Sequence, residues 1–382
     1  MPMKIAVLKE TRAGEKRVAL APAVTGKLVK LGAELHMQSG AGDAAKLPDT
    51  SFQDVAFEPD LTALLGDADI VLSVQAPAVA TVKMMKPGAI LICLVYANRE
   101  QELVKALCEA KITTFAMETV ARISRAQAID VLSTQSALSG YYAPLLGAAN
   151  MPRILPMMTT AVGSLRAAKV LVMGLGVAGL QALATAHRLG AITEGYDVRP
   201  ETKEQALSVG AKFVETGVDA RGEGGYAREL TAEEKLKVNA ALTQHIQEAD
   251  LIITTAAVPG RPSPKLIDAQ QLAGMKPGSV IVDLGAEGGG NCVGTKPGET
   301  VEIGPVTILA PLNVPSHLAQ HASELYAKNL LNLLQLIVRD GQVVLDFEDE
   351  VIAKTVLTHE GEMRNQPVPC VVQLKTPEGA AV

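Results

Sequence analysis

The sequence contains no tryptophan, and aromatic residues make up only 3% of its 382 residues. Proteins that bind single-stranded nucleic acid stack its bases on aromatic side chains, so this class of protein is disfavoured. Basic charge is not in excess either, because 35 Lys and Arg stand against 41 Asp and Glu, for a net charge of -6. Binding to nucleic acid or to an anionic membrane requires a basic surface, and this balance argues against both.

Cysteines and long apolar runs are also scarce. The four cysteines form no closely spaced pair, which favours a reducing compartment over a disulfide or zinc framework. No run reaches the roughly 18 apolar residues that a membrane-spanning helix needs, and the nearest, 330–338, is interrupted by Asn332 and Gln335. The start of the chain becomes charged too soon for a signal peptide. We therefore expect a cytoplasmic protein with no direct membrane insertion.

The sequence does contain a regular alternation of short apolar runs and helical segments. At about 150 residues per domain, the length predicts two or three domains. The predicted strands are 5–8, 70–74, 89–94, 169–173, 192–196, 251–255 and 280–284, and the predicted helices include 21–31, 99–110, 179–189 and 319–339. This order is typical of the α/β class, in which helices cover both faces of a parallel sheet.

An internal repeat sharpens this prediction. Residues 67–92 hold an acidic helix end, a buried strand, a Met-Lys-Pro-Gly turn and a second strand, and residues 248–282 repeat the same order. Two related domains explain the repeat most simply, although chance similarity of α/β units is the alternative. We predict two Rossmann-like doubly wound domains joined by long helices, with a cofactor in the cleft between them. The first domain is discontinuous, 1–138 plus 318–382, and the second is 139–317.

A dinucleotide-binding motif follows the predicted strand 169–173. The sequence Gly174-Leu175-Gly176-Val177-Ala178-Gly179 leads directly into the next predicted helix. Gly174 permits a tight turn, Gly176 lets the backbone approach a pyrophosphate, and Gly179 lets the helix pack closely on the strand. The helix N-terminus, with Val177 and Ala178, offers amide donors to the phosphates. A purely structural packing turn is the alternative.

The next predicted strand ends in Asp197, about 20 residues beyond the glycines. A carboxylate there accepts hydrogen bonds from both hydroxyls of the adenosine ribose and repels a 2′-phosphate, which favours NAD(H) over NADP(H). The following Val198 is expected to lie beside the cofactor. Arg199 is a complication, since an arginine at this place can pair with a 2′-phosphate; its alternative role is a solvated loop charge.

Other segments resemble a known family. Residues 9–20 (Lys-Glu-Thr…Glu-Lys-Arg-Val-Ala-Leu) resemble the opening of the alanine dehydrogenase and transhydrogenase superfamily. Residues 122–133, which begin Arg-Ile-Ser-Arg-Ala-Gln, resemble the signature of the NAD(H)-binding alpha subunit of proton-translocating NAD(P) transhydrogenases, as do 224–227 and 275–280. The similarity extends from Met3 to about Val338.

The resemblance assigns residues to the nicotinamide side of the cofactor. It implies that Arg122 and Gln127 bind there, with Asp130 and Ser133 holding them in position. Gln127, Asp130 and Ser133 recur every three residues, so we expect them on one side of a helix. A solvated polar face that caps a helix is the alternative.

The chain departs from alanine dehydrogenase at two positions. The resemblance places Gln75 where that enzyme has a Lys, and Val95 or Tyr96 where it has a His. Oxidation of an amine or alcohol releases a proton, so a positioned base is useful there. Direct hydride transfer between two nicotinamides needs no base at the reacting carbon, so the departure favours transhydrogenation.

Loops supply the remaining candidates. The Gly-rich segment 215–230 is expected to be mobile, with Gly225 and Tyr226 folding over the nucleotide as a lid, or else it is an ordinary loop. Strand-end loops place Ala256, Glu287 and Asn313 near the cofactor.

Two basic features remain to be assigned. Arg17 is either a substrate-type arginine or a surface charge. His317 and His321 are four residues apart but lack further ligands, so we predict no metal site.

These expectations combine into one function and two alternatives. The resemblance implies a homodimer that presents NADH for hydride transfer to NADP+ on a partner subunit, coupled to proton translocation by membrane-spanning subunits. Because the sequence has no second glycine fingerprint, we expect NADP(H) only on a partner. The resemblance also implies that this chain lies on the cytoplasmic side of the inner membrane. A stand-alone alanine dehydrogenase-like amino-acid dehydrogenase and a non-catalytic NAD(H)-sensing module are the alternatives.

Overall fold

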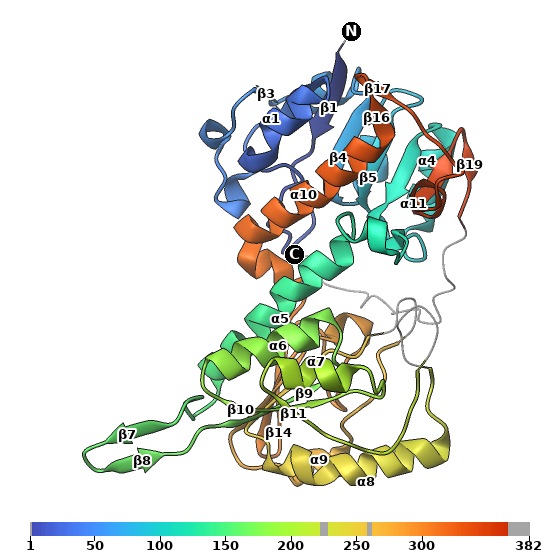
Figure 1. Cartoon of the computed structure of the whole chain (residues 1–382). Helices are drawn as coiled ribbons and strands as arrows, with labels where there is room; N and C mark the ends of the chain where they lie inside the picture. Colours follow the sequence, from blue (N-terminus) through green and yellow to red (C-terminus); the bar gives the residue numbers. More distant parts are fainter. Residues whose placement is uncertain (1, 222–227, 258–261, 366–382) are drawn as a thin grey trace, which may run out of the picture. The chain divides into compact units, whose positions relative to one another are not determined.

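The computed structural model describes residues 2–221, 228–257 and 262–365. The chain forms two compact units (Figure 1). Unit 1 is built from Met1–Leu138 and Asn313–Pro367, and unit 2 from Ser139–Leu312.

Unit 1 contains a sheet with six parallel strands in the order β6-β5-β4-β1-β2-β3. These strands are β1 (Met3–Val7), β2 (Ala33–Gln38), β3 (Val55–Glu58), β4 (Ile70–Gln75), β5 (Ile90–Leu94) and β6 (Thr113–Ala116). Beyond β6, the strands β18 (Val356–His359) and β19 (Glu362–Met363) extend the sheet in antiparallel fashion. This order is that of a doubly wound fold.

Both faces of the unit 1 sheet are covered by helices. Ile5 and Val7 of β1 share one core with α1 (Pro22–Lys30) and α10 (Ala319–Ile337). Ala6, whose side chain points to the other face, shares a second core with α4 (Gln101–Glu109). Alternate residues of one strand therefore enter different cores, as expected for a buried parallel strand.

Unit 2 contains a second sheet in the order β11-β10-β9-β12-β13-β15-β14. Its strands are β9 (Lys169–Met173), β10 (Ile192–Tyr196), β11 (Lys212–Phe213), β12 (Leu251–Thr254), β13 (Ser279–Asp283), β14 (Thr300–Ile303) and β15 (Val306–Leu309). Only the edge strand β14 is antiparallel among the strands of this sheet. The parallel strands follow the Rossmann order, in which the switch point lies between β9 and β12. Its helices include α6 (Val177–Arg188), α7 (Thr202–Ser208), α8 (Ala232–Glu248) and α9 (Ala269–Ala273).

The internal repeat extends to matching side-chain contacts. In unit 1, Lys86 Nζ donates to the carboxylate of Asp69 at 2.6 Å and to a backbone carbonyl two residues before it. In unit 2, Lys276 Nζ donates to the carboxylate of Asp250 at 3.0 Å and again to the carbonyl two residues earlier. In each unit this lysine belongs to the Met-Lys-Pro-Gly turn between the paired strands. The sequence repeat is therefore a structural repeat of one α/β unit.

The 20-residue helix α5 (Val131–Asn150) crosses the boundary between the units. It begins only at Val131, so the prediction that Gln127 and Asp130 lie within one helix is wrong. Gln127 ends a short 3-10 turn, and Asp130 immediately precedes α5.

A hairpin follows α5 in unit 2. It is formed by β7 (Met158–Thr160) and β8 (Gly163–Leu165), and all of its strand residues are exposed. Among the described residues, no helix is long and apolar enough to cross a membrane.

Candidate functional site

The glycine motif lies at the carboxyl end of β9, at the switch point of unit 2. Gly174 has a φ of +97°, which an L side chain rarely adopts. Its carbonyl oxygen accepts a hydrogen bond of 2.7 Å from Thr255 Oγ1, which follows β12. This hydrogen bond links the ends of β9 and β12, the two strands that flank the switch point, at the glycine loop.

The turn presents backbone donors at the start of α6. The helix begins at Val177, and its first amides, those of Val177, Ala178 and Gly179, have no acceptor within the helix itself. Gly176 is exposed, and a side-chain carbon built on it meets no atom within 4 Å. A pyrophosphate therefore has both donors and room at this turn, and the residues present fit a dinucleotide.

Asp197 supports the same turn from the end of β10. Its Oδ2 accepts the amide of Leu175 at 2.7 Å, inside the glycine motif. Its carboxylate also pairs with Arg199, through Nε at 2.8 Å and Nη2 at 2.7 Å. Val198, between them, is half-buried. The sequence-predicted ribose ligand is thus in place next to the glycine loop.

The loops after β12 and β13 are held together by buried polar groups. Asp283 is fully buried, and its carboxylate accepts bonds from two hydroxyls and three backbone amides, contributed by Thr254, Thr295, Gly285, Asn291 and Cys292. Asn291 Nδ2 in turn donates 2.7 Å to the carbonyl of Ala256. This network brings Ala256 to the loop region that also carries Glu287, whose side chain is exposed.

The residues assigned to the nicotinamide side lie in unit 1. Arg122 and Gln127 are exposed. The carboxylate of Asp130 accepts hydrogen bonds from the backbone amide of Ser133 at 3.0 Å and from the Ser133 hydroxyl at 2.5 Å. Asp130 therefore caps the N-terminus of α5. The amide of Asp130 donates to the carbonyl of Gln127 at 3.3 Å. Asp130 and Ser133 therefore fix the end of the short turn that carries Gln127.

Arg17 is neither a surface charge nor isolated. Its side chain is 4% exposed, and it pairs with Glu15, whose side chain is 1% exposed, through Nε at 2.8 Å and Nη2 at 2.6 Å. Burial raises the pKa of Glu15, but the hydrogen bonds and charge of Arg17 outweigh it and lower that pKa to about 2. Further donors to this carboxylate come from Gln75, Asn313 and Ser316.

Asn313 accordingly belongs to unit 1, not to the second predicted domain. It has a φ of +45°, and its Oδ1 accepts from Arg17 at 3.3 Å. The signal for this cluster was the Glu-Lys-Arg spacing near the N-terminus, but the partners lie about 300 residues away in sequence.

Two further, half-buried carboxylates, which sequence reasoning missed, hold strand ends in unit 1. Glu10 accepts the amides of Val74 and Gln75 at the end of β4. Glu118 accepts the amides of Val95 and Tyr96 after β5, at 3.0 and 2.5 Å. Burial raises the pKa of Glu10 to about 7, and burial also raises the pKa of Glu118. The backbone at the ends of β4 and β5, where Gln75, Val95 and Tyr96 lie, is therefore held by hydrogen bonds to these two carboxyl groups.

Gly225 and Tyr226 lie outside the described residues, so the predicted lid remains a prediction. No group of three or more His, Cys, Asp or Glu is placed to hold a metal within 2–221, 228–257 and 262–365.

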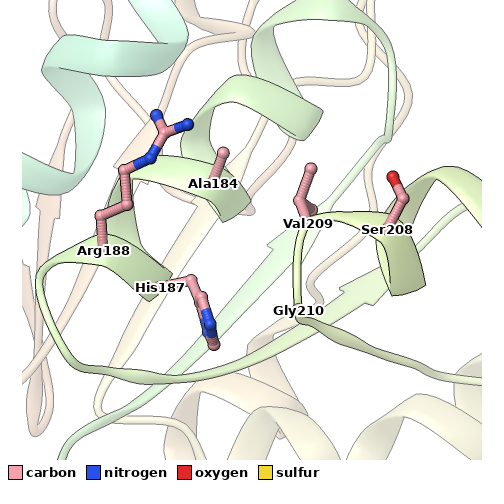
Figure 2. Close-up of a pocket in the computed structure, with 6 residues that line it drawn as sticks. All are labelled: Ala184, His187, Arg188, Ser208, Val209 and Gly210. Carbon is pink, nitrogen blue, oxygen red and sulfur yellow. The ribbon is translucent and has the colours of Figure 1, made fainter.

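A surface pocket lies at the other end of α6 from the glycine loop. It is lined by Ala184, His187, Arg188, Ser208, Val209 and Gly210. Figure 2 shows the Arg188 side chain at the left of the view and the Ser208 side chain at the right. None of the six lining residues belongs to the glycine motif or to the end of β10, so the candidate site is the glycine loop with Asp197.

The fold and this loop define a nucleotide-binding protein of the Rossmann class. Comparison with protein families is more specific. Residues 6–139 match the model described as "Alanine dehydrogenase/PNT, N-terminal domain", and residues 143–366 match "Alanine dehydrogenase/PNT, C-terminal domain". The chain belongs to the alanine dehydrogenase/PNT family.

Within this family, the transhydrogenase alpha subunits are the more similar relatives. The chain is 45% identical to an NAD(P) transhydrogenase alpha-subunit protein of Rhodospirillum rubrum, over 94% of this chain and 97% of that protein. It is 26% identical to the alanine dehydrogenase of Mycobacterium tuberculosis, with full coverage of both. A transhydrogenase structure from Sinorhizobium meliloti superposes with a TM-score of 0.83 at 39% identity, covering 94% of this chain and 98% of that one.

Proposed function

We propose that this chain is the NAD(H)-binding component of a proton-translocating NAD(P) transhydrogenase. It binds NADH and presents it for hydride transfer to NADP+ held by a partner subunit. Glycines 174, 176 and 179 and Asp197 hold the adenosine and pyrophosphate portion, and Arg122 and Gln127 hold the nicotinamide portion. The bound cofactor supplies the hydride, while the protein supplies orientation.

The observation that carries the proposal is which residues stand at the ends of β4 and β5 in unit 1. Gln75 is an amide that donates 2.9 Å to Glu15, and neither it nor Val95 can take up a proton as a base. Tyr96, the other residue at the position of the alanine dehydrogenase His, carries a phenol in place of an imidazole. Glu10 has a raised pKa of about 7, but its two oxygens accept the amides of Val74 and Gln75. Such an arrangement suits hydride transfer between nicotinamides better than oxidation of an amino acid.

The partners and location follow from the same proposal. Hydride transfer requires an NADP(H)-binding subunit and proton translocation requires membrane-spanning subunits, and this chain docks on them at the cytoplasmic face of the inner membrane. A homodimer is supported by the β7–β8 hairpin, because Met157 just before it is 70% exposed and Val162 and Leu165 within it are 98% and 54% exposed. Apolar side chains so exposed on a projecting hairpin are typical of an interface with another chain.

A titration tests the proposal. The purified chain should bind NADH, monitored by nucleotide fluorescence or calorimetry, and bind NADPH much more weakly. Addition of a soluble NADP(H)-binding transhydrogenase domain should then produce hydride transfer between the two nucleotides. NADPH binding as tight as NADH binding would overturn the proposal, as would NAD-dependent turnover of alanine or pyruvate by the chain alone. NADH binding with no transfer in the presence of the partner domain would favour a sensing module.

A further inference from the structure

The carboxylate of Asp197 already accepts four hydrogen bonds within unit 2. Oδ1 accepts the backbone amide of Arg199 at 2.9 Å and its Nε at 2.8 Å. Oδ2 accepts the backbone amide of Leu175 and Arg199 Nη2, both at 2.7 Å. An ionised carboxylate has about four lone-pair sites, so these four donors fill it.

Two of these donors are fixed and two can move. The amides of Leu175 and Arg199 belong to the backbone that shapes the glycine loop and the end of β10. The other two are the forked N–H groups of the Arg199 side chain, which is 18% exposed and thus borders solvent. A ribose with free 2′ and 3′ hydroxyls also brings two donors to this carboxylate. The ribose can therefore replace both hydrogen bonds that the Arg199 side chain donates to this carboxylate.

We infer that Arg199 is a specificity gate that competes with the adenosine ribose for Asp197, so that the ribose binds only when the guanidinium leaves. This inference rests on the proposed NAD(H) site and adds a residue that selects between the two nucleotides. NADH replaces both hydrogen bonds that Asp197 loses when Arg199 leaves. NADPH replaces only one, because its 2′ position is a phosphate that the carboxylate repels. NADPH binding therefore depends on the displaced guanidinium, which can pair with the 2′-phosphate.

Removal of the competing side chain should therefore favour NADH selectively. In Arg199→Ala, the Kd for NADH should fall about three- to tenfold, while the Kd for NADPH should stay the same or rise. Arg199→Lys should lie between this variant and the wild type, because an ammonium cannot occupy both oxygens as a fork does. Arg153→Ala is the matched control: it also removes an arginine from unit 2, but this arginine faces Asp250 at the amino edge of the sheet.

A double-mutant cycle links the effect to Asp197. Asp197→Asn should weaken NADH binding, and adding Arg199→Ala to it should no longer improve binding. Equilibrium binding is measured by calorimetry, and thermal unfolding verifies that each variant is folded. Failure of the wild-type chain to bind NADH would overturn the proposed function itself. NADH binding by the wild type, with equal or weaker binding by Arg199→Ala, would overturn only the gate. A gain that persists in the Asp197→Asn background would also overturn it.

Discussion

A side-chain carbon on Gly179 would lie 1.8 Å from the carbonyl oxygen of Gly174. Real side chains do not approach backbone this closely, so α6 packs on the glycine turn only because residue 179 has no side chain. The motif therefore contains one glycine required by packing and another, Gly176, whose surroundings are open. Substitutions at these two positions should have different consequences.

Gly179→Ala should destabilise unit 2 and abolish NADH binding, because a backbone oxygen cannot move aside without breaking the turn. We expect a loss of about 1–3 kcal/mol or more in the free energy of unfolding. Gly176→Ala should leave the melting temperature nearly unchanged, since φ there is −77° and no atom lies within 4 Å. It should nevertheless weaken NADH binding more than tenfold, because the new methyl group stands where the pyrophosphate approaches. Wild-type affinity in Gly176→Ala would place the pyrophosphate elsewhere.

Arg17→Met should be among the most destabilising substitutions in unit 1. It leaves the carboxylate of Glu15 buried without its charge partner, which costs about 3–5 kcal/mol. Urea denaturation should show a lower midpoint at an unchanged slope. Arg125→Met is the control, since its pair with Asp349 leaves the arginine side chain 51% exposed and should contribute far less to stability. The double variant Arg17→Met/Glu15→Gln should recover some of the loss, and equal effects of the two single arginine substitutions would contradict the argument.

Glu10 should make stability depend on pH near neutrality. Its pKa is raised from 4.5 to about 7 by burial, so the folded state binds this proton more tightly than the unfolded state. The associated stabilisation is complete below about pH 4.5 and is lost as pH rises through 7, a difference of up to about 3 kcal/mol.

Glu10→Gln does not titrate, so its stability relative to wild type should increase from pH 5 to pH 8. Paired denaturation curves at several pH values measure this difference. Glu102→Gln, at an exposed position of α4, supplies the control and should show no such trend. A pH-independent difference between Glu10→Gln and wild type would show that Glu10 is charged throughout.

The exposed hairpin gives a prediction about assembly. Replacing Met157, Val162 and Leu165 with Ser should shift a dimer toward monomer in sedimentation experiments, without loss of NADH affinity at the glycine loop. Leu236→Ser is the control, because Leu236 is 72% exposed on α8, outside the hairpin. A wild-type chain that sediments as a monomer would contradict the proposed homodimer.

Much of the α/β pattern was predictable from local sequence. Strands 169–173 and 192–196 were predicted with the bounds that β9 and β10 have, and the helix predicted over 319–339 is α10 with two fewer residues. Buried parallel strands are continuous apolar runs, so their signal is strong. The start of α5 was predicted less well, because Gln127, Asp130 and Ser133 have helical spacing but the cap at Asp130 sets the boundary. The strands β18 and β19 were missed, since an antiparallel edge has only short, weakly patterned strands.

The sequence by itself determined the glycine turn and the carboxylate at the end of the following strand, because both depend on residues within about 25 positions of one another and on backbone geometry. Only the tertiary structure decided the state of the charged groups. It buried Arg17 with Glu15 beside Asn313, raised the pKa of Glu10, and placed the Arg199 side chain on Asp197. The energy of a charge depends on its burial as well as on its nearest partner. Arg17 and Glu15 are only two residues apart, as are Asp197 and Arg199. The groups that complete the Arg17–Glu15 pair, and the strand end that Glu10 supports, lie about 60 to 300 residues away along the chain.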